Sequence, residues 1–186
     1  MSLRTYPFDL KTSDALLVTR KRGREYKEKV WREIERMEPN TVLKLDFSNI
    51  KFVDASCADE AVVRILARLE AGESPNKYMI LSNVRQQHKE NIDTALNIAK
   101  KAVIVSNEGK WDLLGELVKS HQEVLAYVIK RNNITARELK EKMGYRSVNQ
   151  ASARLGALYK KRLIAREPYR RPVPGGGRQF RYLSLL

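Results

Sequence analysis

The chain has 186 residues, of which 36 are Lys or Arg and 22 are Asp or Glu, so its formal net charge is +14. With 42% hydrophobic and 31% charged residues it has a globular composition, long enough for one large domain or two small ones. The single cysteine, Cys57, excludes an internal disulfide and a cysteine-rich zinc site, and two histidines leave little for a metal centre or a Ser-His-Asp triad. We expect no bound metal and no cofactor.

The positive charge is concentrated at one end of the chain. Residues 1–118 carry 20 basic and 18 acidic side chains, whereas residues 119–186 carry 16 basic and 4 acidic ones. A segment of net charge +12 is expected to bind a polyanion. No apolar run approaches the roughly 18 residues of a membrane-spanning helix, and MSLRTYPFDL lacks the apolar stretch of a secretory signal. We therefore expect a cytoplasmic protein with no membrane partner.

The first two thirds of the sequence alternate between predicted strands and predicted helices. Four short segments rich in β-forming residues are predicted strands: TYPFDL, TVLKLDF, KYMILS and AVIVS. Helical patterns occur in four further segments, near residues 20–37, 58–71, 86–101 and 111–118. This alternation predicts an α/β domain over residues 1–110, a small sheet with helices packed on it. Residues 111–119 are expected to be a linker or the start of a connecting helix, and His88 is expected to be exposed.

Residues 120–186 show a different pattern, in which short helices come first and strands follow. Helices are predicted over 121–130, at ARELKEKM and again along VNQASARLGALYK. The expected helix boundaries are Thr135, which forms a capping box with Glu138, then Gly144 after the second helix and Ser147 before the third. Strands are expected after Leu163-Ile164 and at QFRYLSLL, on either side of the hairpin loop PYRRPVPGGGR.

The C-terminal part of the sequence resembles transcription regulators of the winged helix-turn-helix fold. The segments that carry the resemblance are ITARELKEKMGYRSVNQASARLGALYKKRLIAREP and GGGRQFRYLSLL. The resemblance implies an α+β domain over residues 120–186 whose longest helix enters the major groove of double-stranded DNA. The residues expected to read base edges are Ser147, Asn149, Gln150, Ala153 and Arg154. The residues expected to contact phosphates, some of them from the wing, are Arg146, Lys160, Lys161, Arg162, Arg170, Arg171 and Arg178.

The N-terminal part of the sequence resembles the STAS domain superfamily, whose signature is Asp-Ser-Ser-Gly at a helix start. The segment that carries the resemblance is TVLKLDFSNIKFVDASCADEAVVRIL. SCADEA is more similar still to the STAS-like family of uncharacterised function, whose helix starts Ser-Phe-Ala-Asp-Glu. The resemblance covers residues 5–105 and implies a small mixed sheet packed against helices. In phosphorylatable members the second serine of the signature accepts phosphate from a partner kinase, and Ser56 stands at that position. The alternative is that Ser56 caps the helix.

These observations predict a DNA-binding transcriptional regulator that acts as a homodimer, since winged regulators commonly bind two half-sites. The N-terminal STAS-like domain is expected to bind the partner or signal that modulates it. The alternative is a signalling adaptor whose STAS-like domain docks a kinase-like ATPase or another protein and whose basic domain binds nucleic acid nonspecifically. No catalytic residue is expected, because Asp46, Asp54 and Asp59 are accompanied by no nucleophile or metal-ligand set, so the protein is not expected to be an enzyme.

Overall fold

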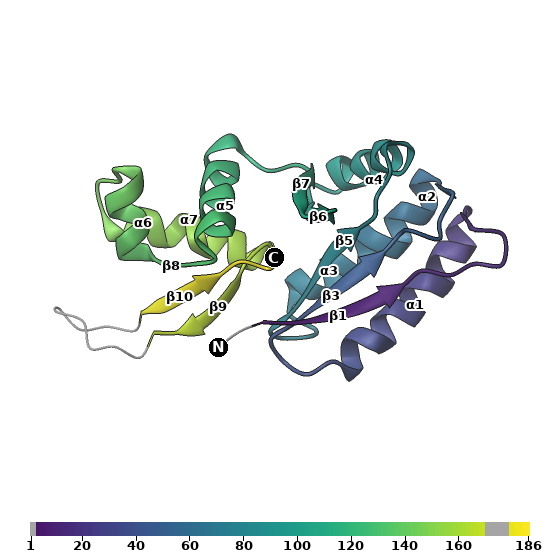
Figure 1. Ribbon diagram of the computed structural model, residues 1–186, viewed down its shortest axis with the longest axis horizontal. Helices are drawn as coiled ribbons and strands as arrows, with labels where there is room; N and C mark the ends of the chain where they lie inside the picture. Colours follow the sequence, from purple (N-terminus) through teal and green to yellow (C-terminus); the bar gives the residue numbers. More distant parts are fainter. Residues whose placement is uncertain (1–2, 170–178) are drawn as a thin grey trace. The chain divides into compact units, whose positions relative to one another are not determined.

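A computed structural model describes residues 3–169 and 179–186 of the chain (Figure 1). These residues form a mixed α/β fold and divide into two compact units, with the boundary between Leu117 and Val118. In the part of the chain that the structure describes, no helix combines the length and the apolar character needed to cross a membrane. Each unit has its own sheet and its own helices.

The N-terminal unit is built on a five-stranded mixed sheet with the strand order β1-β3-β5-β6-β7. Its strands are β1 (Arg4–Asp9), β3 (Thr41–Asp46), β5 (Lys77–Ser82), β6 (Ala102–Asn107) and β7 (Lys110–Gly115). The first four run parallel to one another, and β7 runs antiparallel to β6. A separate parallel pair joins β2 (Leu16–Leu17) to β4 (Phe52–Val53). The four strands predicted from β-forming segments are therefore confirmed.

The helices of this unit pack on one face of the sheet (Figure 1). They are α1 (Arg20–Arg36), α2 (Ala55–Ala58), α3 (Arg64–Ala71) and α4 (Gln86–Ile98), with a π-helical turn, η1 (Asp59–Val63), between α2 and α3. Alternate strand residues such as Leu43, Met79 and Val103 point to that face, as the two-residue period of a strand requires, and meet Ile34 of α1 and Ile92 of α4. Burial of these side chains holds the layers together.

Residues 110–115 correct one expectation, because they form strand β7 and neither a linker nor a helix start. Glu108 and Gly109 both have positive φ angles (48° and 77°), which is the conformation of a two-residue hairpin turn, so the chain folds back along β6. Leu114 is then buried in the core while Trp111, on the opposite face of the strand, is exposed. A segment of this length is too short for its periodicity to distinguish a strand from the start of a helix.

His88 corrects a second expectation, because it is fully buried at the start of α4. Its Nδ1 accepts a hydrogen bond from the Arg85 N–H (3.2 Å), and its Nε2 lies 3.2 Å from the Lys51 carbonyl oxygen. Burial lowers the pKa of His88, so the neutral ring accepts at Nδ1 and donates at Nε2. The side chain thereby ties α4 to the loop that follows β3.

The C-terminal unit contains three helices and a three-stranded antiparallel sheet within the described residues 118–169 and 179–186. Its elements are α5 (Lys119–Arg131), β8 (Asn133–Thr135), α6 (Ala136–Met143), α7 (Val148–Lys160), β9 (Ala165–Pro168) and β10 (Phe180–Leu183). The strand order is β8-β10-β9, so β10 lies in the middle (Figure 1). Of the predicted hairpin loop, residues 168–178, Pro168 is the last residue of β9, and residues 170–178 lie outside the described residues.

The helix boundaries predicted at Thr135, Gly144 and Ser147 are confirmed, whereas Ser120, which the sequence also suggests as a cap, lies inside α5. The Thr135 hydroxyl oxygen accepts the N–H of Glu138 (3.3 Å), and the Glu138 carboxylate accepts the N–H of Thr135 (2.7 Å), which completes the capping box. Gly144 ends α6 with a φ of 66°, in the left-handed region that glycine adopts without a Cβ clash. Ser147 caps α7. These three boundaries set the tight connection between α6 and α7.

Candidate nucleic-acid interface

The predicted base-reading residues begin at the N-terminal end of α7. The Ser147 hydroxyl oxygen accepts the N–H of Gln150 (3.2 Å), which fixes the start of the helix. The apolar face of the helix is fully buried at Ala151, Leu155 and Leu158. The opposite face is therefore directed outward, and the structure brings four of the predicted residues together on the exposed surface: Ser147, Asn149, Gln150 and Ala153.

Arg154 is half-buried, unlike the other four predicted base-reading residues, and its side chain contacts residues of the same unit. Its Nη1 donates a hydrogen bond to the Ser120 hydroxyl at the start of α5 (2.5 Å), and its guanidinium lies 5.3 Å from the centroid of the Tyr145 ring. Five helical residues after Asn149, its Cα is rotated by about 140° from that position, next to the buried face. The helix repeat alone also leaves Arg154 one turn from Gln150, so its contacts with Ser120 and Tyr145 are what show its direction.

The predicted phosphate contacts divide into three groups. Arg146, just before the cap of α7, and Lys160, in its last turn, are exposed, whereas Lys161 is half-buried. Arg162 is only 8% exposed, because the chain leaves α7 with a φ of 57° at this residue and its guanidinium lies near the Tyr159 ring, 5.6 Å from the centroid. In this arrangement Arg162 does not present its charge to solvent, contrary to expectation. The others, Arg170, Arg171 and Arg178, lie outside the described residues.

Two arginines that the sequence reading did not single out organise the strand pair β9–β10. The guanidinium of Arg166 on β9 lies between two aromatic rings, 4.2 Å from the centroid of Tyr159 and 4.1 Å from that of Phe180. The Arg181 guanidinium lies 5.1 Å from the centroid of Tyr169. A guanidinium stacked on a ring keeps its N–H groups at the edge of the plane, where they can still donate. In the sequence, the closely spaced arginines and aromatic residues of REPY and QFRY are the pattern that could have indicated these contacts.

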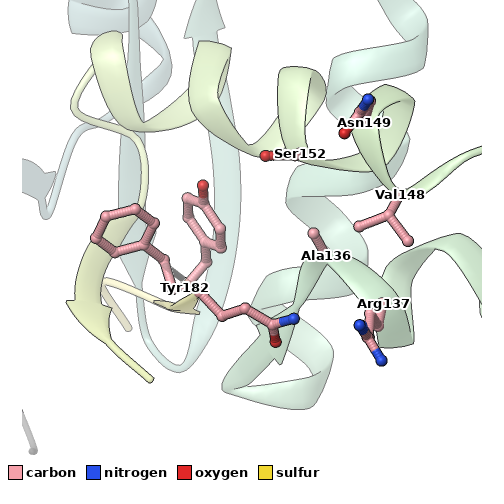
Figure 2. Close-up of a pocket in the computed structure, with 8 residues that line it drawn as sticks. Ala136, Arg137, Val148, Asn149, Ser152 and Tyr182 are labelled. Atoms are coloured by element: carbon pink, nitrogen blue, oxygen red, sulfur yellow. The ribbon is translucent and has the colours of Figure 1, made fainter. Parts of the chain in front are cut away.

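A pocket of about 290 Å³ opens beside the exposed face of α7 (Figure 2). Residues from α6, α7 and the strand β10 with its preceding residue line it: Ala136, Arg137, Val148, Asn149, Ser152, Gln179, Phe180 and Tyr182. Of these only Asn149 was named from the sequence. The others were missed because the lining comes from three elements that are distant in the chain, and periodicity within one element does not indicate which elements meet.

In the N-terminal unit, Ser56 is not the cap of the helix that follows it, which corrects the alternative reading of this residue. Asp54 is the cap. Its Oδ1 accepts hydrogen bonds from the N–H of Cys57 (2.6 Å) and from the Ser56 hydroxyl (2.9 Å), and its Oδ2 accepts one from the N–H of Thr19 (2.7 Å). Because α2 begins at Ala55, Ser56 already lies inside the helix. Burial raises the pKa of Asp54, but these hydrogen bonds outweigh that effect and hold it below its usual value.

Cys57 follows Ser56 and is a packed core residue. It is fully buried, and burial, followed by the charge of Asp54, raises the pKa of its thiol to about 12. A thiol with that pKa remains protonated at neutral pH, so it is neither a nucleophile nor a metal ligand there.

The carboxylates that could have served an enzyme are engaged in structural contacts. Asp46 accepts hydrogen bonds from the N–H of Ser48 (2.8 Å) and from Asn83 (2.7 Å). Asp59 forms ion pairs with Arg20 (3.0 Å) and Arg64 (3.6 Å). Over residues 3–169 and 179–186, no three His, Cys, Asp or Glu side chains gather as metal ligands would. Comparison of the chain with protein-family models, with curated proteins and with solved structures finds no match.

Proposed function

We propose that this protein is a DNA-binding transcriptional regulator, with a C-terminal winged helix-turn-helix that reads the major groove and an N-terminal STAS-like domain that binds a partner or signal. The order of elements from α5 to β10, helix, strand, two helices and two strands, supports the first assignment. Parallel strands joined through helices on one face, with a helix starting directly behind Asp54, support the second.

The exposed face of α7 is the observation that carries this proposal. The helix contains no acidic residue, and its outer face presents Asn149, Gln150 and Ala153 between Arg146 and Lys160. Side-chain amides pair with adenine edges, and an alanine methyl can contact the methyl group of thymine. An α-helix about 10–12 Å across fits the major groove of B-form DNA. The chemistry and the shape of this face therefore suit duplex DNA better than an acidic protein surface.

The rest of the C-terminal unit supports the same assignment by charge. Its 16 basic residues outnumber 4 acidic ones, and two exposed cations lie at the ends of the base-reading face: Arg146, just before the cap of α7, and Lys160, in its last turn. Phosphate contacts of this kind supply affinity without sequence preference, and they weaken as salt rises. A twofold-symmetric dimer would place two such helices on half-sites about one helical turn apart.

The decisive experiment selects duplexes from a random pool with the full chain at physiological salt and repeats the selection with Asn149→Ala. The full chain should yield a consensus of two related half-sites, and Asn149→Ala should lose discrimination at one base pair by about tenfold. Gln86→Ala, an exposed amide in the N-terminal unit, is the matched control and should select the parental consensus. Equal affinity for every duplex would favour the nonspecific adaptor instead, and no duplex binding would overturn the proposal.

A further inference from the structure

The starts of two helices meet at the pocket between α6, α7 and β10. Ala136 and Arg137 are the first two residues of α6, Val148 and Asn149 are the first two of α7, and all four line the pocket. In an α-helix the first N–H groups have no acceptor within the helix, and the capping hydroxyls of Thr135 and Ser147 take only the third of them. Two positive helix ends therefore contribute to one pocket.

Tyr182 provides a second, independent indication of a ligand in the pocket. The residue is only 3% exposed, and its side chain extends from β10 toward α7 on the side of Ser152 (Figure 2). Within the described part of the chain, its hydroxyl has no hydrogen-bond partner. Although the ring is buried, the hydroxyl oxygen itself is accessible from the pocket, so it is available to form a hydrogen bond with a bound polar group.

The charge of the lining selects the sign of that group. Arg137 contributes a cation, Asn149, Ser152 and Gln179 contribute further hydrogen-bond donors, and the eight described lining residues include no carboxylate. The pocket volume of about 290 Å³ equals that of about ten water molecules at roughly 30 Å³ each. An anion of several non-hydrogen atoms fits this space together with some of its water. The lining therefore favours a tetrahedral oxyanion over a cation or an apolar molecule.

The position of the pocket connects it to the proposed DNA interface. Asn149 belongs both to the pocket lining and to the exposed face of α7 that is proposed to enter the groove. A strand whose bases meet that face must carry its backbone past the edge of the helix, on one side or the other. The pocket occupies one of those edges.

We propose that this pocket holds one phosphate group of the bound DNA, an inference that rests on the proposed function and specifies a fixed backbone contact beside the base-reading face. The phosphate oxygens would accept hydrogen bonds from the first-turn N–H groups of α6 and α7 and from the Tyr182 hydroxyl. Arg137 would neutralise the charge. The same chemistry serves an internal phosphodiester and a phosphate at a strand end, so the test separates these two sources.

The test uses the full chain and the duplex recovered by selection, with one phosphate at a time replaced by a neutral methylphosphonate. The parent should lose affinity by about fivefold to tenfold at one internal phosphate in each half-site, as expected for the net contribution of a single hydrogen bond. In Tyr182→Phe the loss at that phosphate should shrink to about threefold or less, because two changes to one contact are not additive. Losses at other phosphates should not change.

Two controls and a second variant separate the possible results. Tyr127→Phe, in α5 and outside the pocket lining, should give the parental profile, and Arg137→Gln should reduce the slope of log affinity against log salt by about one. A duplex closed at both ends by hairpins removes terminal phosphates, so an effect that persists there comes from an internal phosphodiester. An effect seen only with open, 5′-phosphorylated ends would assign the pocket to a strand end.

The failure of this inference can be told apart from failure of the proposed function. Duplex binding by the parent with identical methylphosphonate profiles for the parent, Tyr182→Phe and Arg137→Gln would overturn the phosphate pocket and leave DNA binding intact. Absence of duplex binding by the parent would overturn both.

Discussion

The two units of this protein use their charged residues in different ways. In the N-terminal unit, cations are matched by carboxylates of the same unit, as in the pairs Arg22–Asp14 (2.9 Å) and Lys101–Glu70 (2.7 Å). In the C-terminal unit, basic residues outnumber acidic ones by 16 to 4, and Arg166 lies between two aromatic rings. Arg68 of the N-terminal unit also lies over a ring, that of Trp31 (3.7 Å), but it is paired with Glu73 (2.7 Å) as well.

This difference shows what each charge distribution can do. Cations and carboxylates paired within one unit contribute to its own stability and leave a nearly neutral surface. A surplus of cations repels itself in the free protein and becomes favourable only when an external polyanion neutralises it. Stacking on rings orders an arginine without cancelling its charge. We infer that charge stabilises the N-terminal unit and serves recognition in the C-terminal unit.

The strongest test of this division is to destabilise each core separately. Leu43→Ala in β3 and Leu155→Ala in α7 both remove a fully buried side chain, and each should cost about 2–5 kcal/mol of unfolding free energy in its own unit. Trp31 and Trp111 both lie in the N-terminal unit, so tryptophan fluorescence during urea unfolding reports that unit alone. Leu43→Ala should shift this transition, and Leu155→Ala should leave it in place.

Circular dichroism of the same samples supplies the complementary measurement, since both units contain helices. Leu155→Ala should shift only the dichroism transition of the C-terminal unit, which tryptophan fluorescence does not report. A shift of the tryptophan transition by both variants would show that the units unfold together. The two units would then not have separate free energies of unfolding.

A smaller effect is expected where the N-terminal unit uses a carboxylate as a cap. Asp54→Ala removes the acceptor for the N–H groups of Cys57 and Thr19, and Thr19 depends on it because its φ of 74° is strained for a β-branched residue. We expect a loss of about 2 kcal/mol, within the range for caps and charged hydrogen bonds. Ser56→Ala, measured in the same urea titration, should cost less than about 0.5 kcal/mol. The reverse order would restore Ser56 as the cap.

The capping of α2 also shows how far the sequence can be read. The motif Asp54-Ala55-Ser56 marked a helix start correctly, but the residue that caps it depends on which backbone N–H groups come near, and one of these belongs to Thr19, far along the chain. Local signals were sufficient for the capping box at Thr135 and the glycine at Gly144, because each involves neighbouring residues only.

The burial of single side chains and the formation of a pocket were harder to predict from the sequence. His88 looked like an exposed polar residue at a helix start, and its burial follows from the Lys51 carbonyl, which comes from a different loop. In the sequence Tyr182 is one residue of a predicted closing strand, and only the arrangement of β10 against α6 and α7 reveals its place in a pocket wall. Contacts between elements distant in the chain have no signature in the periodicity of either one.

Glu60 offers a pH-dependent test of the paired charges. It is 6% exposed in η1, and its carboxylate accepts from Lys27 (3.3 Å) and Arg24 (3.4 Å). Burial raises the pKa of Glu60, but these partners outweigh it and lower the pKa below its usual value. Glu60→Gln should destabilise the N-terminal unit by about 1–2 kcal/mol at pH 7, less than for a fully buried pair because the cations reach solvent.

The sign of the pH dependence follows from the lowered pKa. The unfolded chain takes up the proton more readily, so the stabilisation is complete above the ordinary Glu pKa of about 4.3 and is lost as pH falls through the folded value. The difference between the parent and Glu60→Gln in urea unfolding, followed by tryptophan fluorescence, should therefore shrink below about pH 4.3. A difference that stays constant down to lower pH would show that shape, and not charge, makes Glu60 stabilising.

The smallest expected effect concerns Arg154 and separates recognition from structure within the cationic unit itself. Its guanidinium is directed at Ser120 and Tyr145, so it stabilises the contact between α7 and α5 and should contribute nothing to base preference. Arg154→Ala should change the ratio of affinities for consensus and mismatched duplexes by less than about twofold, against about tenfold for Asn149→Ala at its own base pair. Titration of both variants with the two duplexes at one salt concentration measures this directly. If Arg154→Ala relaxed the preference as strongly as Asn149→Ala does, the arginine would have to swing out on binding, and the free-state hydrogen bond to Ser120 would mark a resting position that DNA displaces.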